Sequence, residues 1–268
     1  MNCVQSNRAH EIRVKGNEIK VLKFSVASLN VEIDCLYGNA FRDFKPYHNM
    51  FDKPDILISV SQEDIDRELL KHPEIMNPNV TVDDERVAVT YDYGCLEPFV
   101  ALPKLADQVV LFETLLMHGA VIEKEGYAYM FTAPSGTGKT TRLRLWLNQY
   151  PDSTIINGDK PLIRIDSEKV YAYGTPWSGK EGWNTNTNAP LQAIFILERA
   201  EKDHIEEISL GKAFPVLLQQ THCPLNPDLM RKTIRLLMSF EGRVKIYRYQ
   251  STLDPETVKL AFETAKPR

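Results

Sequence analysis

Residues 133–141 read Ala-Pro-Ser-Gly-Thr-Gly-Lys-Thr-Thr, and this stretch decides the fold. An apolar segment, residues 127–132, precedes it, and a segment with helical periodicity, residues 140–149, follows it. A strand, a glycine-rich loop and a helix in this order are typical of a phosphate-binding loop. Glycines let successive backbone N–H groups turn toward phosphates, and the helix adds free N–H groups and the positive end of its dipole.

The side chains of this motif predict a site for ATP and Mg²⁺. Lys139 is expected to reach the β- and γ-phosphates, and the Thr140 hydroxyl is expected to ligate Mg²⁺. The full consensus begins with glycine, and the small residue Ala133 stands there instead. A loop that merely caps a helix is the alternative interpretation. The predicted nucleotide-binding residues are Ser135, Gly136, Thr137, Gly138, Lys139, Thr140 and Thr141.

A carboxylate is expected near the phosphates, because such loops use an acid from a neighbouring strand to hold the metal or its waters. Asp159 is the best candidate, since it follows the short expected strand 154–156. The alternative is that Asn157-Gly158-Asp159 forms only a turn, which these residue types favour. Asp166 carries the same side chain but lies at the tip of an expected hairpin, where the turn interpretation is stronger.

Further candidates lie outside the loop. His118 stands beside an apolar run, where a histidine is more often a hydrogen-bonded structural residue than a catalyst. Lys180 lies in a long polar segment, residues 174–190, which is typical of a lid and could bring a cation to the γ-phosphate. A solvated surface lysine is the alternative there. Arg199 is a weaker candidate for a phosphate contact.

Three segments together resemble the catalytic domain of HPr kinase/phosphorylase: residues 118–122 (His-Gly-Ala-Val-Ile), 135–141, and 156–160 (Ile-Asn-Gly-Asp-Lys). The loop also looks like that of phosphoenolpyruvate carboxykinase. The chain further resembles the shorter HPr-kinase-like proteins that accompany genes for ribosomal-peptide modification. In that family the histidine helps to bind phosphates and the acid acts as general base or metal ligand, which here implies His118 and Asp159. The family usually has two adjacent acids, and Gly158 stands in place of the first.

The resemblance implies an α/β fold of the HPr-kinase and carboxykinase type over residues 108–268. A smaller β-rich N-terminal domain is expected over residues 1–107. The implied activity is Mg-ATP-dependent transfer of the γ-phosphoryl group to a hydroxyl, on a Ser or Thr of a protein or peptide. The implied catalytic residues are Asp159, His118 and Lys139, with Thr140 and Asp159 as metal ligands. A small-molecule kinase and a nucleotide-binding sensor without turnover remain as alternatives, and homo-oligomers are possible.

Composition excludes several other classes of protein. The 268 residues carry a net charge of −4, whereas a general nucleic-acid binder or a polybasic membrane-surface protein is expected to be basic. The apolar share of 43% is ordinary for a globular chain, and no stretch approaches the length of a membrane-spanning helix. The four cysteines are scattered and form no metal-binding or disulfide pattern. We therefore expect a cytoplasmic protein with free thiols.

Periodicity and turn residues predict the secondary structure in outline. A hairpin of two strands, 11–14 and 19–24, is expected around residues 15–17, and a strand is expected at 87–91. Strands are also predicted at 55–60, 120–124, 127–132, 154–156, 162–165, 170–173, 193–197 and 244–249. Helices are predicted at 62–71, 102–117, 140–149, 210–219, 228–240 and 255–265.

Overall fold

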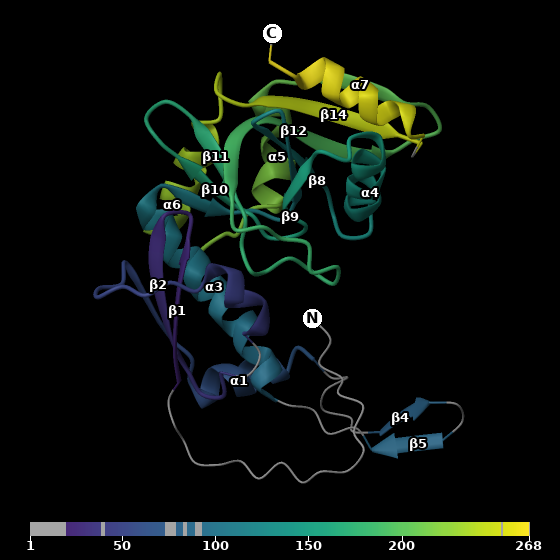
Figure 1. Ribbon diagram of the computed structural model, residues 1–268. Coiled ribbons are helices and arrows are strands. Elements are labelled where there is room, and N and C mark those ends of the chain that lie inside the picture. The colour runs from purple at the N-terminus through teal and green to yellow at the C-terminus, as the bar shows by residue number, and fades with distance from the viewer. Residues whose placement is uncertain are drawn as a thin grey trace. The chain divides into compact units, whose positions relative to one another are not determined.

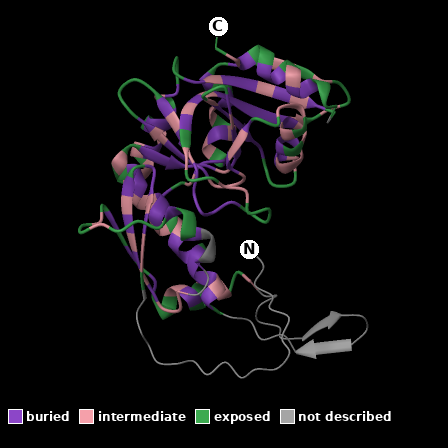
Figure 2. Ribbon diagram, in the orientation of Figure 1, coloured by how far each residue is buried: buried purple, intermediate pink, exposed green. Residues whose placement is uncertain are grey.

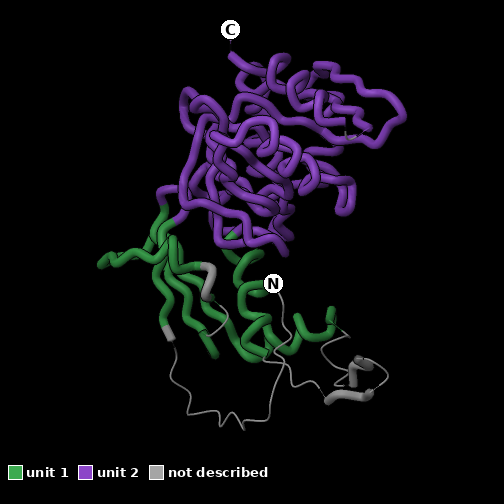
Figure 3. Tube along the Cα trace, turned by 45° about the vertical axis from the view of Figure 1, so that its right-hand side comes forward, with its two compact units in different colours: residues 1–25, 29–105 green, residues 26–28, 106–268 purple. Residues whose placement is uncertain are grey.

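The computed structural model describes a mixed α/β protein with a small N-terminal sheet and a larger sheet (Figure 1). The chain clusters into two compact units, residues 1–25 with 29–105 and residues 26–28 with 106–268 (Figure 3). The division falls inside one helix, close to the predicted boundary after residue 107. That residues 1–107 and 108–268 form two separate domains stays a prediction. The described residues are 20–38, 41–72, 79–82, 85–88, 93–252 and 254–267.

The first unit contains a three-stranded sheet in the order β1-β2-β3 and a separate pair, β4 and β5. Helix α1 begins at a capping box, in which Ser61 and Asp64 satisfy each other's backbone N–H groups. The strands are β1 (Lys20–Val26), β2 (Leu29–Cys35), β3 (Ile56–Ser59), β4 (Asn79–Val82) and β5 (Glu85–Ala88). The helices are η1 (Arg42–Tyr47), α1 (Gln62–Leu69), η2 (Tyr93–Leu96) and α3 (Glu97–Val109).

The second unit is built on a nine-stranded sheet in the order β6-β10-β11-β12-β8-β7-β9, with β14 and then β13 added beside β12. Strand β12 runs parallel to β8 and β14, and the other pairs are antiparallel. The strands are β6 (Thr114–Leu116), β7 (Ala120–Lys124), β8 (Tyr127–Thr132), β9 (Thr154–Asn157), β10 (Leu162–Ile165), β11 (Val170–Tyr173), β12 (Asn188–Arg199), β13 (His204–Glu207) and β14 (Lys245–Ser251).

Helices cover both faces of this sheet, which gives three layers (Figure 1). Trp146 of α4 and Phe262 of α7 belong to one hydrophobic cluster, and Leu217 of α5 and Leu237 of α6 belong to another. Because helices cover each face of the sheet, residues that point to either face are buried (Figure 2). The helices are η3 (Val110–Phe112), α4 (Lys139–Gln149), α5 (Leu210–Gln219), α6 (Pro227–Met238) and α7 (Glu256–Ala265).

One predicted helix is wrong at its end. The sequence predicts a helix over residues 102–117, but α3 spans Glu97–Val109 and Glu113 has a positive φ of 54°. Residues 114–116 instead form β6, which pairs with β10. A continuous apolar run has the same appearance in a buried strand and in a buried helix, so periodicity does not separate the two. The pairing with β10 decided the outcome.

The other predicted elements that lie in the described residues are confirmed, with ends that differ by a few residues. Strand β12 is much longer than the predicted 193–197, and β2, β4 and β13 were not predicted. The second strand of the expected hairpin corresponds to β1. The first strand and the turn of that hairpin, and residues 89–91 of another expected strand, lie outside the described residues. Over the described ranges, none of the helices has the length and hydropathy needed to cross a membrane.

Candidate functional site

The glycine-rich loop, residues 133–138, joins the end of β8 to the start of α4. Gly136 and Gly138 have positive φ values of 79° and 112°, a conformation that L side chains rarely adopt. Arg142 is the first residue whose N–H bonds back along the helix, to the carbonyl of Gly138 at 2.9 Å. Over the described residues, the N–H groups of residues 139–141 have no backbone acceptor. The helix start therefore offers free donors to an anion.

The Lys139 side chain is folded back over the loop and is buried. Its Nζ donates to the carbonyl oxygens of Ala133 at 2.8 Å and Pro134 at 3.3 Å. Burial lowers the pKa of Lys139, the charge of Asp159 acts in the opposite direction, and Lys160 lowers it further. The ammonium group is thus held by neutral carbonyls, which leaves its charge available to an anion at the helix start.

Asp159 and His118 are brought together, with 3.2 Å between Oδ1 of the carboxylate and Nε2 of the imidazole. The backbone between strands sets this distance, because the N–H of Gly119 donates to the carbonyl of Asp159 at 2.9 Å. Burial acts to raise the pKa of Asp159, but the hydrogen bond from His118 and the charges of Lys160, His118 and Lys139 outweigh it. The pKa therefore lies below its usual range, and the carboxylate is ionised at neutral pH.

Gln220 holds the other side of the histidine ring, and the sequence analysis missed it. Its Oε1 lies 2.8 Å from Nδ1 of His118, and its backbone carbonyl accepts the His118 N–H at 2.7 Å. Gln220 is buried at the end of α5. Nothing local in the sequence connects it with His118, so only the packing of α5 against the sheet reveals the contact.

Asn157 organises the turn that carries the acid, and this role was also missed. Its fully buried side chain accepts the N–H groups of Asp159 at 2.8 Å and Lys160 at 2.7 Å through Oδ1. Its Nδ2 donates to the carbonyls of Thr175 at 2.9 Å and Trp177 at 3.3 Å. The turn interpretation of residues 157–159 and the catalytic interpretation are therefore compatible, since the turn positions the carboxylate.

The position of the absent second acid is crowded. An added Cβ at Gly158 would lie 3.2 Å from the carbonyl oxygen of Ser178 and 3.3 Å from that of Trp183. The N–H of Gly158 also donates to the Trp183 carbonyl at 2.8 Å. A side chain here would require the backbone at Ser178 and Trp183 to move by a few tenths of an ångström. Both residues belong to the following segment, residues 174–187. We call this segment the polar loop.

The polar loop passes directly beside the acid. A Cβ built on Gly179 would meet Cβ of Asp159 at 3.2 Å, so the backbone there approaches the carboxylate closely. Lys180, the next residue, is exposed and forms no hydrogen bond or ion pair within the described part of the chain. The structure therefore places its backbone near the site without directing its charge there. Arg144 of α4 contacts Glu181 at 3.0 Å and covers the ring of Trp183.

A cavity of about 320 Å³ lies beside the glycine-rich loop, at the ends of β12 and β14. Gly136, Thr141, Arg199 and Thr252 are among its lining residues. Arg199 donates to the carbonyl of Gly136 at 2.6 Å and so contacts the loop itself. The neighbouring Arg142 is buried and donates to the hydroxyls of Thr257, at 2.7 Å, and Ser251. This cavity is continuous with the loop that presents the free N–H groups.

The residues present fit a nucleotide with Mg²⁺. Ser135 and Gly136 are exposed, Thr137 and Thr141 are half-buried, and the Thr137 hydroxyl bonds within the loop to Pro134 at 2.9 Å. The Thr140 hydroxyl is half-buried and has no protein partner among the described residues. No group of three or more acidic, His or Cys side chains in the described ranges forms a metal cage. Mg²⁺ on phosphates needs only one or two protein ligands beside water.

Comparisons with known proteins point to one family. The model of the family described as SynChlorMet cassette protein ScmC matches residues 99–233, just over half of the chain. A solved structure of the Hpr(Ser) kinase/phosphatase from Coxiella burnetii has 11% sequence identity and a TM-score of 0.27, and the alignment covers 46% of this chain and 92% of that one. A likeness this weak supports no argument. No match was found among curated proteins. The chain belongs to the family of the SynChlorMet cassette protein ScmC.

Proposed function

We propose that the protein is a Mg-ATP-dependent kinase that transfers the γ-phosphoryl group to a hydroxyl, a Ser or Thr of a protein or peptide. The observation that carries the proposal is the juxtaposition of His118, Asp159 and Lys139 around a helix start with free N–H groups. Positioning and electrostatic stabilisation account for most catalysis of phosphoryl transfer. This arrangement supplies an ionised carboxylate, a cation and oriented backbone donors in one place.

Each residue has a distinct role in this proposal. The N–H groups of residues 135–140 and Nζ of Lys139 bind the phosphates, and Lys139 leaves its carbonyl partners to do so. Bound Mg²⁺ would neutralise charge on the phosphates, with Thr140 and Asp159 as its protein ligands. Alternatively, Asp159 accepts the proton of the acceptor hydroxyl. His118, held by Gln220, donates to Asp159 in the free protein and contacts phosphate oxygens in the complex.

The nucleoside would occupy the cavity beside the glycine-rich loop. Its volume of about 320 Å³ is at the lower end of the range for small-molecule sites. Arg199 lies at the loop end of this cavity, in contact with the Gly136 carbonyl, where a second cation favours a polyphosphate. The acceptor would approach from the side of the polar loop, since Gly179 lies next to Asp159 there.

A nucleotide-binding sensor is the second candidate function, and the missing second acid favours it. A carboxylate side chain at position 158 would require a small shift of the polar loop, whose backbone carbonyls lie 3.2–3.3 Å from the added Cβ. The two functions differ in turnover and not in binding. A sensor would bind Mg-ATP and hydrolyse none.

The first experiment measures ATP binding and slow background hydrolysis, with and without Mg²⁺, for the wild type and Lys139→Ala. The kinase proposal expects Mg-dependent binding, weakened at least about tenfold in the variant, which corresponds to roughly 1.4 kcal/mol, together with measurable hydrolysis. Lys212→Ala is the matched control, because that lysine is exposed on α5 and lies outside the glycine-rich loop. Binding without hydrolysis would favour the sensor. No binding by the wild type would overturn both functions.

A further inference from the structure

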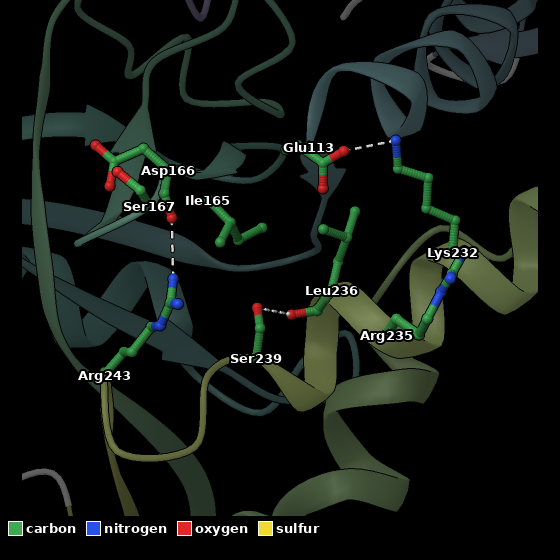
Figure 4. Close-up of a pocket in the computed structure, with 9 residues that line it drawn as sticks. All are labelled: Glu113, Ile165, Asp166, Ser167, Lys232, Arg235, Leu236, Ser239 and Arg243. Atoms are coloured by element: carbon green, nitrogen blue, oxygen red, sulfur yellow. Dashed lines mark hydrogen bonds and ion pairs between the residues drawn. The ribbon is translucent and has the colours of Figure 1, made fainter.

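A second cavity, of about 670 Å³, lies in the second unit away from the glycine-rich loop (Figure 4). Residues from the start of β6, the end of β10, and helix α6 with the turn that follows it line this cavity. Ile165 and Leu236 are buried and contribute apolar surface, and polar side chains stand around them. The proposed kinase chemistry uses none of these residues.

Two paired strands connect this cavity with the proposed catalytic site. Strand β6 has Glu113 before it and His118 shortly after it, and β10 begins shortly after Asp159 and ends at Ile165. The strands pair antiparallel, and the N–H of Ile165 donates to the carbonyl of Glu113 at 2.8 Å. At about 3.3 Å per residue, the cavity lies roughly 15–20 Å from the His118–Asp159 pair. A peptide of about five or six extended residues spans that distance.

The cationic side chains at the cavity differ in how far they are neutralised. Lys232 forms an ion pair with Glu113 at 2.6 Å. Arg243 donates to the backbone carbonyl of Asp166 at 2.9 Å and has no carboxylate within ion-pair distance in the described part of the chain. Arg235, on α6, has neither a hydrogen bond nor an ion pair with any described residue. The Arg235 guanidinium is therefore open to anions, and Arg243 interacts with the charge of Asp166 without forming an ion pair with it.

The carboxylate of Asp166 is held mainly by backbone N–H groups, which lower its pKa, and the charge of Arg243 lowers this pKa further. Its Oδ1 accepts the N–H groups of Glu168 at 2.7 Å and Lys169 at 2.5 Å, within the hairpin turn. Figure 4 shows the Asp166 side chain turned away from Leu236, whereas Arg235 and Arg243 stand on opposite sides of that leucine. The cavity lining thus combines apolar residues, Ile165 and Leu236, with the cations Arg235 and Arg243.

We propose that this cavity docks an acidic peptide segment: two carboxylates pair with Arg235 and Arg243, and an apolar side chain packs on Ile165 and Leu236. Guanidinium groups match carboxylates with two parallel hydrogen bonds, which gives both charge and orientation. The volume is several times that of a single small anion and lies within the range of sites for larger ligands. That the segment belongs to the phosphoryl acceptor rests on the proposed kinase function.

The experiment measures binding of a fluorescein-labelled peptide by anisotropy, without nucleotide, at low salt. The probe contains alternating glutamate and leucine, and the comparison peptide has lysine in place of each glutamate. We test Arg235→Glu and Arg243→Glu against the control Arg231→Glu, which makes the same charge change on α6 at an exposed residue paired with Asp228. Unfolding temperatures of all variants establish that each is folded.

The proposal expects the acidic probe to bind the wild type and the lysine peptide not to bind. Each cavity variant should raise the Kd at least about tenfold, the control by less than about twofold, and added salt should weaken binding. Equal affinity for both peptides, equal loss in the control, or no binding of the probe overturns the proposal. Lys139→Ala should bind the probe normally, so failure of ATP binding and failure of peptide docking give different results.

Discussion

Nε2 of His118 lies 3.2 Å from Oδ1 of Asp159, and the partner on the other side of the ring is Gln220, at 2.8 Å from Nδ1. The imidazole is thus fixed at both nitrogens, between a carboxylate and an amide oxygen. The charges of Lys160 and Lys139 also act on this carboxylate and help to hold the pKa of Asp159 below its usual range. The pair therefore presents an ionised acid at neutral pH beside the glycine-rich loop.

Asp159→Asn is expected to abolish phosphoryl transfer, or background ATP hydrolysis, while ATP affinity changes by less than about threefold, because general-base and metal roles act mainly on the transition state. Hydrolysis is measured by released phosphate, and affinity by calorimetry. If the variant hydrolyses ATP as fast as the wild type, Asp159 has no part in turnover. If neither protein hydrolyses ATP and both bind it equally well, the sensor function is favoured.

Gln220→Leu is expected to lower kcat severalfold with little change in KM for ATP, because the His118 ring loses the hydrogen-bond partner that orients it. The loss of one buried hydrogen bond should also reduce the free energy of unfolding by about 1 kcal/mol. Gln220→Glu keeps an acceptor oxygen at the same place and should retain more activity. Equal kcat in wild type and Gln220→Leu would contradict a positioning role.

Gly174→Ala is expected to destabilise the protein by about 2 kcal/mol or more, since overpacking forces backbone to move. Its Cβ would lie 2.7 Å from the carbonyl oxygen of Ile156 and would collide with that of Thr185. Gly211→Ala is the matched control, because its Cβ meets nothing within 4 Å in α5 and alanine favours helices. Thermal unfolding compares the two, and a similar melting temperature for both would refute the predicted contact.

Arg144→Ala is expected to loosen the polar loop with little effect on global stability. The variant loses the ion pair with Glu181 and the contact with the Trp183 ring, both at the protein surface, where such pairs contribute about 1 kcal/mol or less. Trypsin should cleave after the exposed Lys180 several times faster than in the wild type. Arg231→Ala breaks an exposed pair elsewhere and should leave this cleavage rate unchanged.

Asp64 is expected to make the first unit less stable in acid. Burial acts to raise the pKa of Asp64. Hydrogen bonds from Lys104 and Ser61, together with the charge of Lys104, outweigh burial and lower this pKa from 3.8 to about 2. The folded state therefore binds the proton less readily than the unfolded chain. The stabilisation is complete above about pH 4 and is lost as the pH falls toward 2. Lys104 is partly exposed, so solvent screening reduces the contribution to roughly 1 kcal/mol.

The free energy of unfolding, measured against denaturant at several pH values, checks this prediction. Asp64→Asn should remove the part of the pH dependence between about pH 4 and pH 2. Asp52→Asn serves as a control, because Asp52 is exposed and has no ion pair within the described residues. A pH dependence that is the same in all three proteins would show that the Asp64 contacts do not hold in solution.

The sequence by itself determined the features that depend on a few consecutive residues: a turn, a helix cap and the glycine-rich loop. Glu125 and Gly126, both with positive φ, close the turn between β7 and β8, and Ser61 caps α1. The glycine-rich loop forms between a strand and a helix at the predicted place, with Gly136 and Gly138 in conformations that favour glycine. In each case the physical cause is confined to a few consecutive residues, so the sequence displays it.

Tertiary structure decided what distant residues do together. Residues 114–116 became a strand because β10 pairs with them, and their apolar pattern alone did not distinguish that outcome from a helix. The distances that join His118 to Asp159 and Gln220 depend on sheet register and on the packing of α5. The cavity between Arg235 and Arg243 likewise depends on packing. Such contacts arise only when the hydrophobic faces of the sheet are buried, because burial fixes which side chains meet.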